Sequence, residues 1–198
     1  MKEEKIQAIR NAIKEKYRRC SISPQGLFTY TTGKNGMLEL GYNTEWVNSM
    51  PAEVAEYFCG VGNPFYAEFI REGERVLDVG CGAGVDLMIA SSLVGSKGAA
   101  CGIDLSEEMA ERARENIGRS NCGLAQVVCG AAEELPFADQ CFDTVISNGV
   151  INLSPEKEKV FHEIYRVLTY GGHLQFADIV LESSLSAADA SNLQAWSN

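Results

Sequence analysis

The sequence predicts an α/β fold, a doubly wound parallel sheet preceded by a helical and loop segment. Three observations predict it. An apolar run at 75–79 opens directly into a glycine-rich turn and a helix-compatible segment. A second apolar run, at 99–103, ends in Asp104, and further strand-like and helix-like runs alternate up to residue 181. Such alternation with short connections is typical of a parallel sheet covered by helices on both faces.

The composition limits the classes of partner. The chain has 198 residues and a net charge of −10, which fits one domain with an appendage and a core that buries roughly 70% of the unfolded surface. No basic cluster indicates nucleic-acid binding, so a small-molecule partner is favoured. The charged start at 1–5 has no apolar segment behind it, and no run reaches the ~20 apolar residues of a membrane span. We expect a soluble, cytoplasmic protein with no membrane partner.

The cysteines indicate neither a disulfide framework nor a metal centre. They form an odd set of seven without a C-x-x-C pair, so no metal site is expected. Cys81, Cys101 and Cys129 fall in or beside predicted strands, and we expect them to be buried as small apolar residues.

The first 65 residues are predicted to form a lid. At 3–19 the apolar residues Ile6, Ile9, Ile13 and Tyr17 recur at helical spacing, which predicts an amphipathic helix packed on the core or on a partner chain. The stretch 20–41 is interrupted by glycine and proline and is expected to be a mobile loop. A short helix is expected at 52–58. A prefix with so little regular structure before the first core strand is suited to cover a ligand site.

The turn after the first strand predicts a ligand cradle. Gly80, Gly82 and Gly84 let the main chain turn tightly and approach a ligand, and the N–H groups that start the helix at 85–93 point into the same space. A negative or carboxylate-bearing group is expected there. Asp104 follows Gly84 by twenty residues, the position of a carboxylate that binds ribose hydroxyls.

The spacing of the glycines discriminates between nucleotide cofactors. The dinucleotide fingerprint is G-x-G-x-x-G, whereas here the third glycine comes one residue early and Asp78 lies within the preceding strand. Binding of a diphosphate is therefore disfavoured. An NAD-dependent oxidoreductase remains the alternative from another enzyme class, because it would share the strand, the turn and the acid.

The rest of the chain completes the sheet. Ser106 is expected to cap a helix that stops at Gly118, and the loops at 130–137 and 148–150 are expected at the ligand edge of the sheet. Further strands are expected at 125–129, 142–147 and 173–181. A helix is expected to start with Pro155 at its first position and to end at Gly171-Gly172. Its buried stripe is expected to comprise Val160, Phe161, Ile164, Val167 and Leu168.

The assembled motifs resemble those of the class I S-adenosylmethionine-dependent methyltransferases and, more narrowly, of the arsenite methyltransferase family. They are Cys81-Gly82-Ala83-Gly84-Val85-Asp86, Leu93-Val94-Gly95-x-x-Gly98, Gly102-Ile103-Asp104-Leu105-Ser106-x-x-Met109, Ser147-Asn148-x-Val150-Ile151-Asn152-Leu153 and Ile164-Tyr165-Arg166-Val167-Leu168. The resemblance implies a Rossmann-like domain at 66–181, after the lid at 1–65 and before a tail at 182–198.

The resemblance also implies S-adenosylmethionine as cofactor and assigns roles to residues. Asp78 belongs to the cofactor strand, and Asn148 would close the pocket. The other implied roles are Gly80, Gly82 and Gly84 at the methionine end, Asp104 at the ribose, Leu105 against the adenine, the Ala132-Glu133 backbone at the adenine edge, and Tyr57 as an aromatic near the cofactor.

The acceptor is less defined than the cofactor. Family members that methylate arsenic bind it through cysteine thiolates, and Cys59 matches one such position. Gly149 stands where another is expected, and a further one would fall beyond Asn198. One thiolate is a poor three-coordinate site, so a small-molecule acceptor other than arsenite is favoured. A cofactor-binding module without acceptor groups remains the non-enzymatic alternative.

The sequence identifies neither the catalytic residues nor the surface of assembly directly. No general base is evident, since His162 and His173 lie in a predicted helix and a predicted strand, and the catalytic residues stay unknown. The fifth strand is expected to present an open edge. That edge, or the N-terminal helix, could mediate a homodimer.

Overall fold

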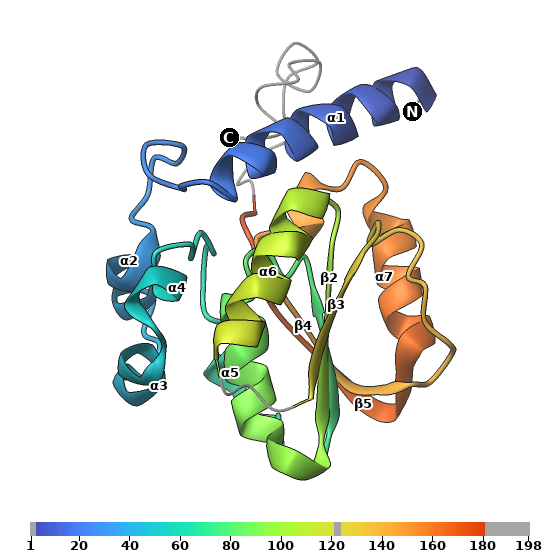
Figure 1. Cartoon of the computed structure of the whole chain (residues 1–198). Helices are drawn as coiled ribbons and strands as arrows, with labels where there is room; N and C mark the ends of the chain where they lie inside the picture. The colour runs from blue at the N-terminus through green and yellow to red at the C-terminus, as the bar shows by residue number, and fades with distance from the viewer. Residues whose placement is uncertain (1–2, 121–123, 181–198) are drawn as a thin grey trace.

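The fold is a five-stranded sheet in the order β3-β2-β1-β4-β5 with all neighbours parallel (Figure 1). The computed structural model describes residues 3–120 and 124–180. The strands are β1 (Arg75–Val79), β2 (Ala99–Asp104), β3 (Ala125–Cys129), β4 (Phe142–Asn148) and β5 (Leu168–Ala177). The predicted doubly wound architecture is confirmed. Cys122, residue 181 and the predicted tail at 182–198 lie outside the described residues.

Helices cover both faces of the sheet. Along β1, successive side chains point to opposite faces: Val76 packs with α5, while Leu77 packs with α7. The helices of the domain are α5 (Val85–Val94), α6 (Glu107–Arg119) and α7 (Lys157–Val167), with short 3-10 turns η2 (Gly95–Lys97) and η3 (Ile151–Leu153). Ser106 caps α6 as predicted, because its hydroxyl accepts a hydrogen bond from Met109 N.

The N-terminal segment surrounds one end of this domain. Its elements are α1 (Glu3–Cys20), α2 (Gly33–Glu39), α3 (Thr44–Ser49), α4 (Ala52–Ala55) and η1 (Pro64–Ala67). Figure 1 shows α1 lying across one end of the sheet, with α2, α3 and α4 grouped at its side. No helix in the described parts of the chain combines the length and the apolar character that a membrane span requires.

The expectation of a loop at 20–41 was wrong in its second half. This stretch contains α2, and α3 follows where no helix was expected. Gly36, one of the glycines expected to interrupt this stretch, lies inside α2 and allows a close approach: a Cβ there would lie 2.4 Å from the Thr31 carbonyl oxygen. The glycine therefore serves packing inside a helix.

The last helix and strand also differ from expectation. Helix α7 begins at Lys157, two residues after Pro155, and it ends at Val167. Gly171-Gly172 does not end it, because these glycines lie within β5, at an irregularity of the β4–β5 register. A Cβ on Gly172 would come within 2.8 Å of the Asp143 carbonyl oxygen, so the strands approach too closely for a side chain.

Two expectations about burial were wrong as well. Phe161 lies in the predicted stripe of α7 but is exposed, and its ring packs edge-on against Phe176 of β5. Cys129 is exposed, since β3 is the last strand of the sheet on its side. Cys81 is buried as predicted, and Cys101 is half-buried.

Candidate functional site

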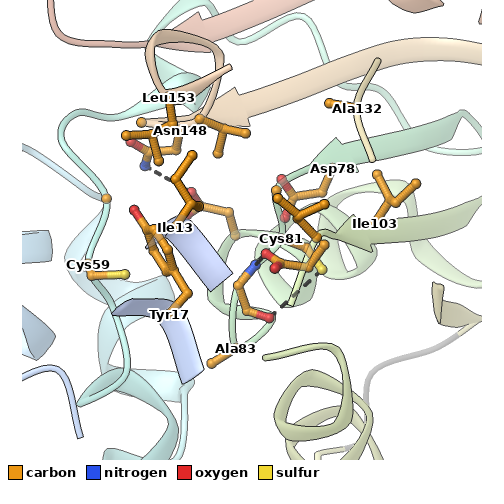
Figure 2. Close-up of a pocket in the computed structure, with 18 of the residues that line it drawn as sticks. Ile13, Tyr17, Cys59, Asp78, Cys81, Ala83, Ile103, Ala132, Asn148 and Leu153 are labelled. Atoms are coloured by element: carbon orange, nitrogen blue, oxygen red, sulfur yellow. Dashed lines mark hydrogen bonds between the residues drawn. The ribbon is translucent and has the colours of Figure 1, made fainter. Parts of the chain in front are cut away.

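A cavity lies where β1, β2 and β4 end, beneath α1. The glycine turn forms one wall, the segment 57–60 forms another, and α1 lies over both. Figure 2 shows Tyr17 and Cys59 on one side of this cavity and Asp78 and Ile103 on the other. In an open α/β sheet, the carboxyl ends of the strands are the usual site of ligand binding.

The structure brings the predicted site residues together with one exception. The residues that line the cavity are Tyr57, Cys59, Asp78, Gly80, Gly82, Asp104, Leu105, Ala132, Glu133 and Asn148. Gly84 lies outside the lining. It caps α5 in a left-handed conformation, and a Cβ there would lie 3.2 Å from the Ala113 Cβ of α6. Its role is helix packing.

The glycine turn is held against β2 by its own main chain. Gly80 N and Cys81 N both donate to the Ile103 carbonyl, at 2.7 and 3.0 Å. Gly80 has φ +74°, and a Cβ there would lie 2.2 Å from Val150 Cγ2. Both the backbone conformation and the available space therefore require glycine.

Asp104 links the end of β2 to this turn. One carboxylate oxygen accepts from Gly82 N at 2.8 Å and the other from Ser106 N at 2.9 Å. Burial raises the pKa of Asp104 to about 6, although these backbone donors favour its ionised form. A carboxylate has about four acceptor positions, so the group can hold the turn and still accept hydroxyl donors from a ligand.

Two further carboxylates are buried beside the cavity. Asp78 Oδ2 has no hydrogen-bond partner among the described residues. Burial, followed by the neighbouring charge of Asp86, raises the pKa of Asp78 well above its usual range. An orphaned buried acceptor is costly. A ligand that brings a cationic or hydrogen-bond-donating group to this wall would satisfy it, as the amino group of S-adenosylmethionine could.

Asn148 is the centre of a buried network. Its side-chain nitrogen donates to Asp86 Oδ2 at 3.0 Å, and its oxygen accepts from Val61 N at 2.8 Å. Tyr42 donates to Asp86 Oδ1 at 2.8 Å. The network ties the N-terminal segment to β4. Asp86 belongs to the Cys81–Asp86 motif but is not among the predicted site residues, and nothing in the sequence indicates Tyr42.

Cys59 offers a thiol to the cavity. Its carbonyl accepts from the Tyr30 hydroxyl at 2.9 Å, which fixes this segment. Burial raises the pKa of the Cys59 thiol well above its usual range, so the thiol is protonated at neutral pH. Gly149 also lines the cavity and provides no second thiol. Within 3–120 and 124–180, no three His, Cys, Asp or Glu side chains gather as metal ligands would.

Three lining residues come from α1 and were not predicted as site residues. Ile13 and Tyr17 belong to the apolar stripe, whose target proves to include this cavity, and Arg10 joins them. The helical periodicity predicted a buried face but not what that face would contact. The C-terminal end of α1 is anchored by Arg112 of α6, whose Nε donates to the Ser21 carbonyl at 3.1 Å.

A family model described as a methyltransferase domain matches residues 70–198. The chain belongs to this methyltransferase family. The match covers the sheet, the glycine turn and Asp104, whereas α1 to α4 lie before it.

Relatives of this methyltransferase domain include arsenite methyltransferases. The chain is 40% identical over 149 residues to the arsenite methyltransferase of Halobacterium salinarum. This alignment covers 75% of this chain and 38% of the relative. The chain is 36% identical over 110 residues to a demethylmenaquinone methyltransferase of Listeria welshimeri, covering 55% of this chain and 46% of the relative. The chain thus spans less than half the length of these relatives.

A solved structure agrees with the sequence comparison. The crystal structure of an arsenic(III) S-adenosylmethionine methyltransferase from Chlamydomonas reinhardtii superposes with a TM-score of 0.65 and 39% sequence identity. The superposition covers 72% of this chain and 50% of that one. The five-stranded methyltransferase domain and its class I fold are therefore shared.

Proposed function

We propose that this chain is an S-adenosylmethionine-dependent methyltransferase that acts on a small-molecule acceptor. The observation that carries the proposal is Asp104: it holds Gly82 N at 2.8 Å and lines the same cavity as the glycine turn. A ribose acid and a main-chain cradle thus meet in one site. Family membership supports the same cofactor, and so does the unpaired acceptor on Asp78.

Different residues of the cavity would bind different parts of the cofactor. Gly80 and Gly82 would hold the methionine end, where Asp78 would accept from its amino group. Asp104 would accept from the ribose hydroxyls. Leu105 and the loop at Ala132-Glu133 would hold the adenine, with Tyr57 near the cofactor, and Asn148 would close the pocket.

Positioning accounts for most of the chemistry. When bound, S-adenosylmethionine supplies a methyl group already activated by its sulfonium. The cavity walls orient the acceptor toward that methyl and exclude water, which is where the rate enhancement arises. Tyr17 and Ile13 contribute to that exclusion because they cover the cavity from α1.

Among small-molecule acceptors, the proposal favours one other than arsenite, and arsenite stays the alternative. Of the two cysteines that line the cavity among the described residues, Cys59 and Cys81, only Cys59 matches an arsenic-binding position of the family, and a single thiolate leaves trivalent arsenic short of ligands. The second candidate function is a cofactor-binding module without turnover, which the absence of a thiol at Gly149 favours.

Calorimetry with S-adenosylmethionine and with NADH tests the proposal first. Binding of the former and not the latter is expected, and the reverse would contradict it. Methyl transfer from labelled cofactor to arsenite, thiols and a metabolite panel then separates enzyme from module. Cys59→Ser should abolish turnover only for a thiophilic acceptor and should leave cofactor binding unchanged.

We further propose that the chain divides into a lid at 1–65, a methyltransferase domain at 66–181 and a tail at 182–198. We also propose that the protein is located in the cytoplasm. Six described cysteines are free, as suits a reducing compartment. Cell fractionation tests the location. Limited proteolysis tests the boundaries, because cleavage near 65 should leave the methyltransferase domain intact.

A homodimer through β5 is the proposed assembly, with α1 as the alternative surface. The strand Leu168–Ala177 contains no Asp, Glu, Lys or Arg, and Tyr170 is 88% exposed on it. Edge strands usually carry charges that prevent pairing. Sedimentation should detect a dimer that Tyr170→Lys dissociates, and a wild-type monomer would contradict the assembly.

A further inference from the structure

A polar cluster closes the cavity at the loop after β3. Arg10 of α1 places Nη2 3.2 Å from Glu156 Oε2 and 3.5 Å from Glu133 Oε1. Glu133 is also held by the Ser154 hydroxyl, which donates to Oε1 at 2.6 Å. The Glu133 side chain is only 8% exposed. Arg10 and Ser154 therefore hold the Glu133 carboxylate in place. Glu133 and Glu156 in turn hold the Arg10 guanidinium.

Arg10 retains a buried donor that these carboxylates do not use. Its Nε is buried and has no hydrogen-bond partner among the described residues, and the side chain lines the cavity. Buried donors in folded proteins are nearly always paired. A guanidinium fixed at Nη2, with Nε unpaired beside a cavity, is arranged to donate to a ligand.

The position of Arg10 indicates which part of the ligand it meets. Gly130 N donates to the Asp104 carbonyl at 2.9 Å, so the loop that carries Ala132 and Glu133 starts at the proposed ribose acid. In a nucleoside the base is attached directly to the ribose. A base on a ribose bound at Asp104 would therefore extend toward Ala132 and Arg10, where the ring nitrogens of a purine would act as acceptors.

We propose that Arg10 is a cofactor-binding residue that recognises the purine end, with Nε donating to a ring nitrogen while Glu133 and Glu156 fix the guanidinium. This assignment rests on the proposed function and adds to it a contact from outside the residues that the family model matches. Through it, α1 becomes part of the cofactor site as well as its cover.

Another cation of α1 provides a matched control. Arg18 pairs with Glu15 at 2.8 Å on the exposed surface of the same helix, and it does not line the cavity. Arg18→Ala removes an arginine and an ion pair from α1 without changing the cavity.

The test measures the affinity of two probes by calorimetry. S-adenosylhomocysteine contains both ends of the cofactor, whereas 5′-methylthioadenosine retains the nucleoside and lacks the amino acid. Arg10→Ala should weaken both by about tenfold, as expected for a lost charge-assisted hydrogen bond, and Arg18→Ala should change neither. Arg10→Lys should also weaken both, because an ammonium has no planar fork to orient.

Three results would overturn the assignment. Wild-type affinity of Arg10→Ala for both probes would show that Arg10 makes no contact. Weakening for S-adenosylhomocysteine alone would place Arg10 at the amino-acid end. Failure of the wild type to bind either probe would refute the proposed function itself, and this result is distinguishable because it precedes any substitution. If Arg10→Ala does not fold, as judged by circular dichroism, Arg10→Lys decides between these outcomes.

Discussion

The methyltransferase domain and the N-terminal segment build the same cavity by different means. The domain contributes main chain at Gly80 and Gly82 and a carboxylate at Asp104, whereas the segment contributes larger side chains such as Tyr17 and Tyr57. Main-chain groups and a carboxylate suit a cofactor whose chemistry is fixed. Larger side chains can vary in shape, so we expect the domain to make the main-chain contacts to the cofactor, and the segment to add side-chain contacts such as that of Arg10 and to border the acceptor.

The largest effect is expected inside the domain, at Gly80. A Cβ would clash with Val150 at 2.2 Å and force a side chain into a left-handed conformation. Gly80→Ala should lower the free energy of unfolding by about 3 kcal/mol and abolish cofactor binding. Gly73→Ala is the control, since φ is +89° with nothing within 4 Å, and it should cost about 1 kcal/mol. Equal losses in urea denaturation would show that crowding at the turn is unimportant.

The next effect concerns the acid of the cofactor site. Asp104→Ala should weaken cofactor binding by about 1.5–3 kcal/mol, because it removes acceptors for the ribose and the carboxylate that orients Gly82 N. Asp139→Ala provides a matched change, since Asp139 is exposed and paired with Arg166. Calorimetry should separate the two variants, and unchanged affinity in Asp104→Ala would place the ribose elsewhere.

A pH dependence follows from the same acid. Burial raises the pKa of Asp104 to about 6. The folded state therefore takes up a proton between pH 6 and the unfolded pKa near 3.8, so the contribution of Asp104 to stability is present at low pH and lost as pH rises through 6. Binding has the opposite sign: a ligand that needs the ionised carboxylate binds up to about tenfold more weakly per pH unit below 6.

The difference between wild type and Asp104→Asn isolates this titration from that of other carboxylates. Relative to the asparagine variant, the wild type should gain unfolding free energy and lose cofactor affinity as pH falls from 7 to 5. Parallel pH profiles for the two proteins would show that Asp104 does not titrate in this range.

The smallest effect is expected at the junction of the two regions. Tyr42→Phe removes the hydroxyl that donates to Asp86 at 2.8 Å but retains the ring packed against Phe58. It should cost about 1 kcal/mol in urea denaturation. It should also raise the pKa of Asp86, which burial already raises to about 6 and which the Tyr42 hydrogen bond lowers. Tyr165→Phe, at a side chain 78% exposed, should cost nothing measurable. Equal stability of the two variants would mean that the junction depends on packing alone.

The sequence predicted most of the domain because its signals are local. Strands β1, β2 and β3 begin and end close to where expected, since each apolar run is followed directly by a charged residue or a glycine. Asp104 and the glycine turn were found for the same reason. Their positions along the chain are fixed by the strand–turn–helix unit itself.

The contacts that were missed join residues distant in sequence. Asn148 bonds to Tyr42 across 106 positions and Arg10 to Glu156 across 146, and no local pattern encodes such pairs. Glycine was the other source of error. At Gly36 and Gly172 it marks a close approach of two backbones rather than the end of an element, and only the packed structure distinguishes these uses.

The backbone at Gly149 determines how readily this cavity could be re-engineered for soft metalloids. Its φ of +70° disfavours any L side chain, and a Cβ would lie 3.2 Å from both methyl groups of Val61. A cysteine introduced at this position would therefore press on Val61, two residues after Cys59. A metalloid bound by both thiols would depend on the geometry of this segment. A side chain at this position therefore needs Val61 to shift by a few tenths of an ångström, so a change in acceptor chemistry here is coupled to the packing of Val61.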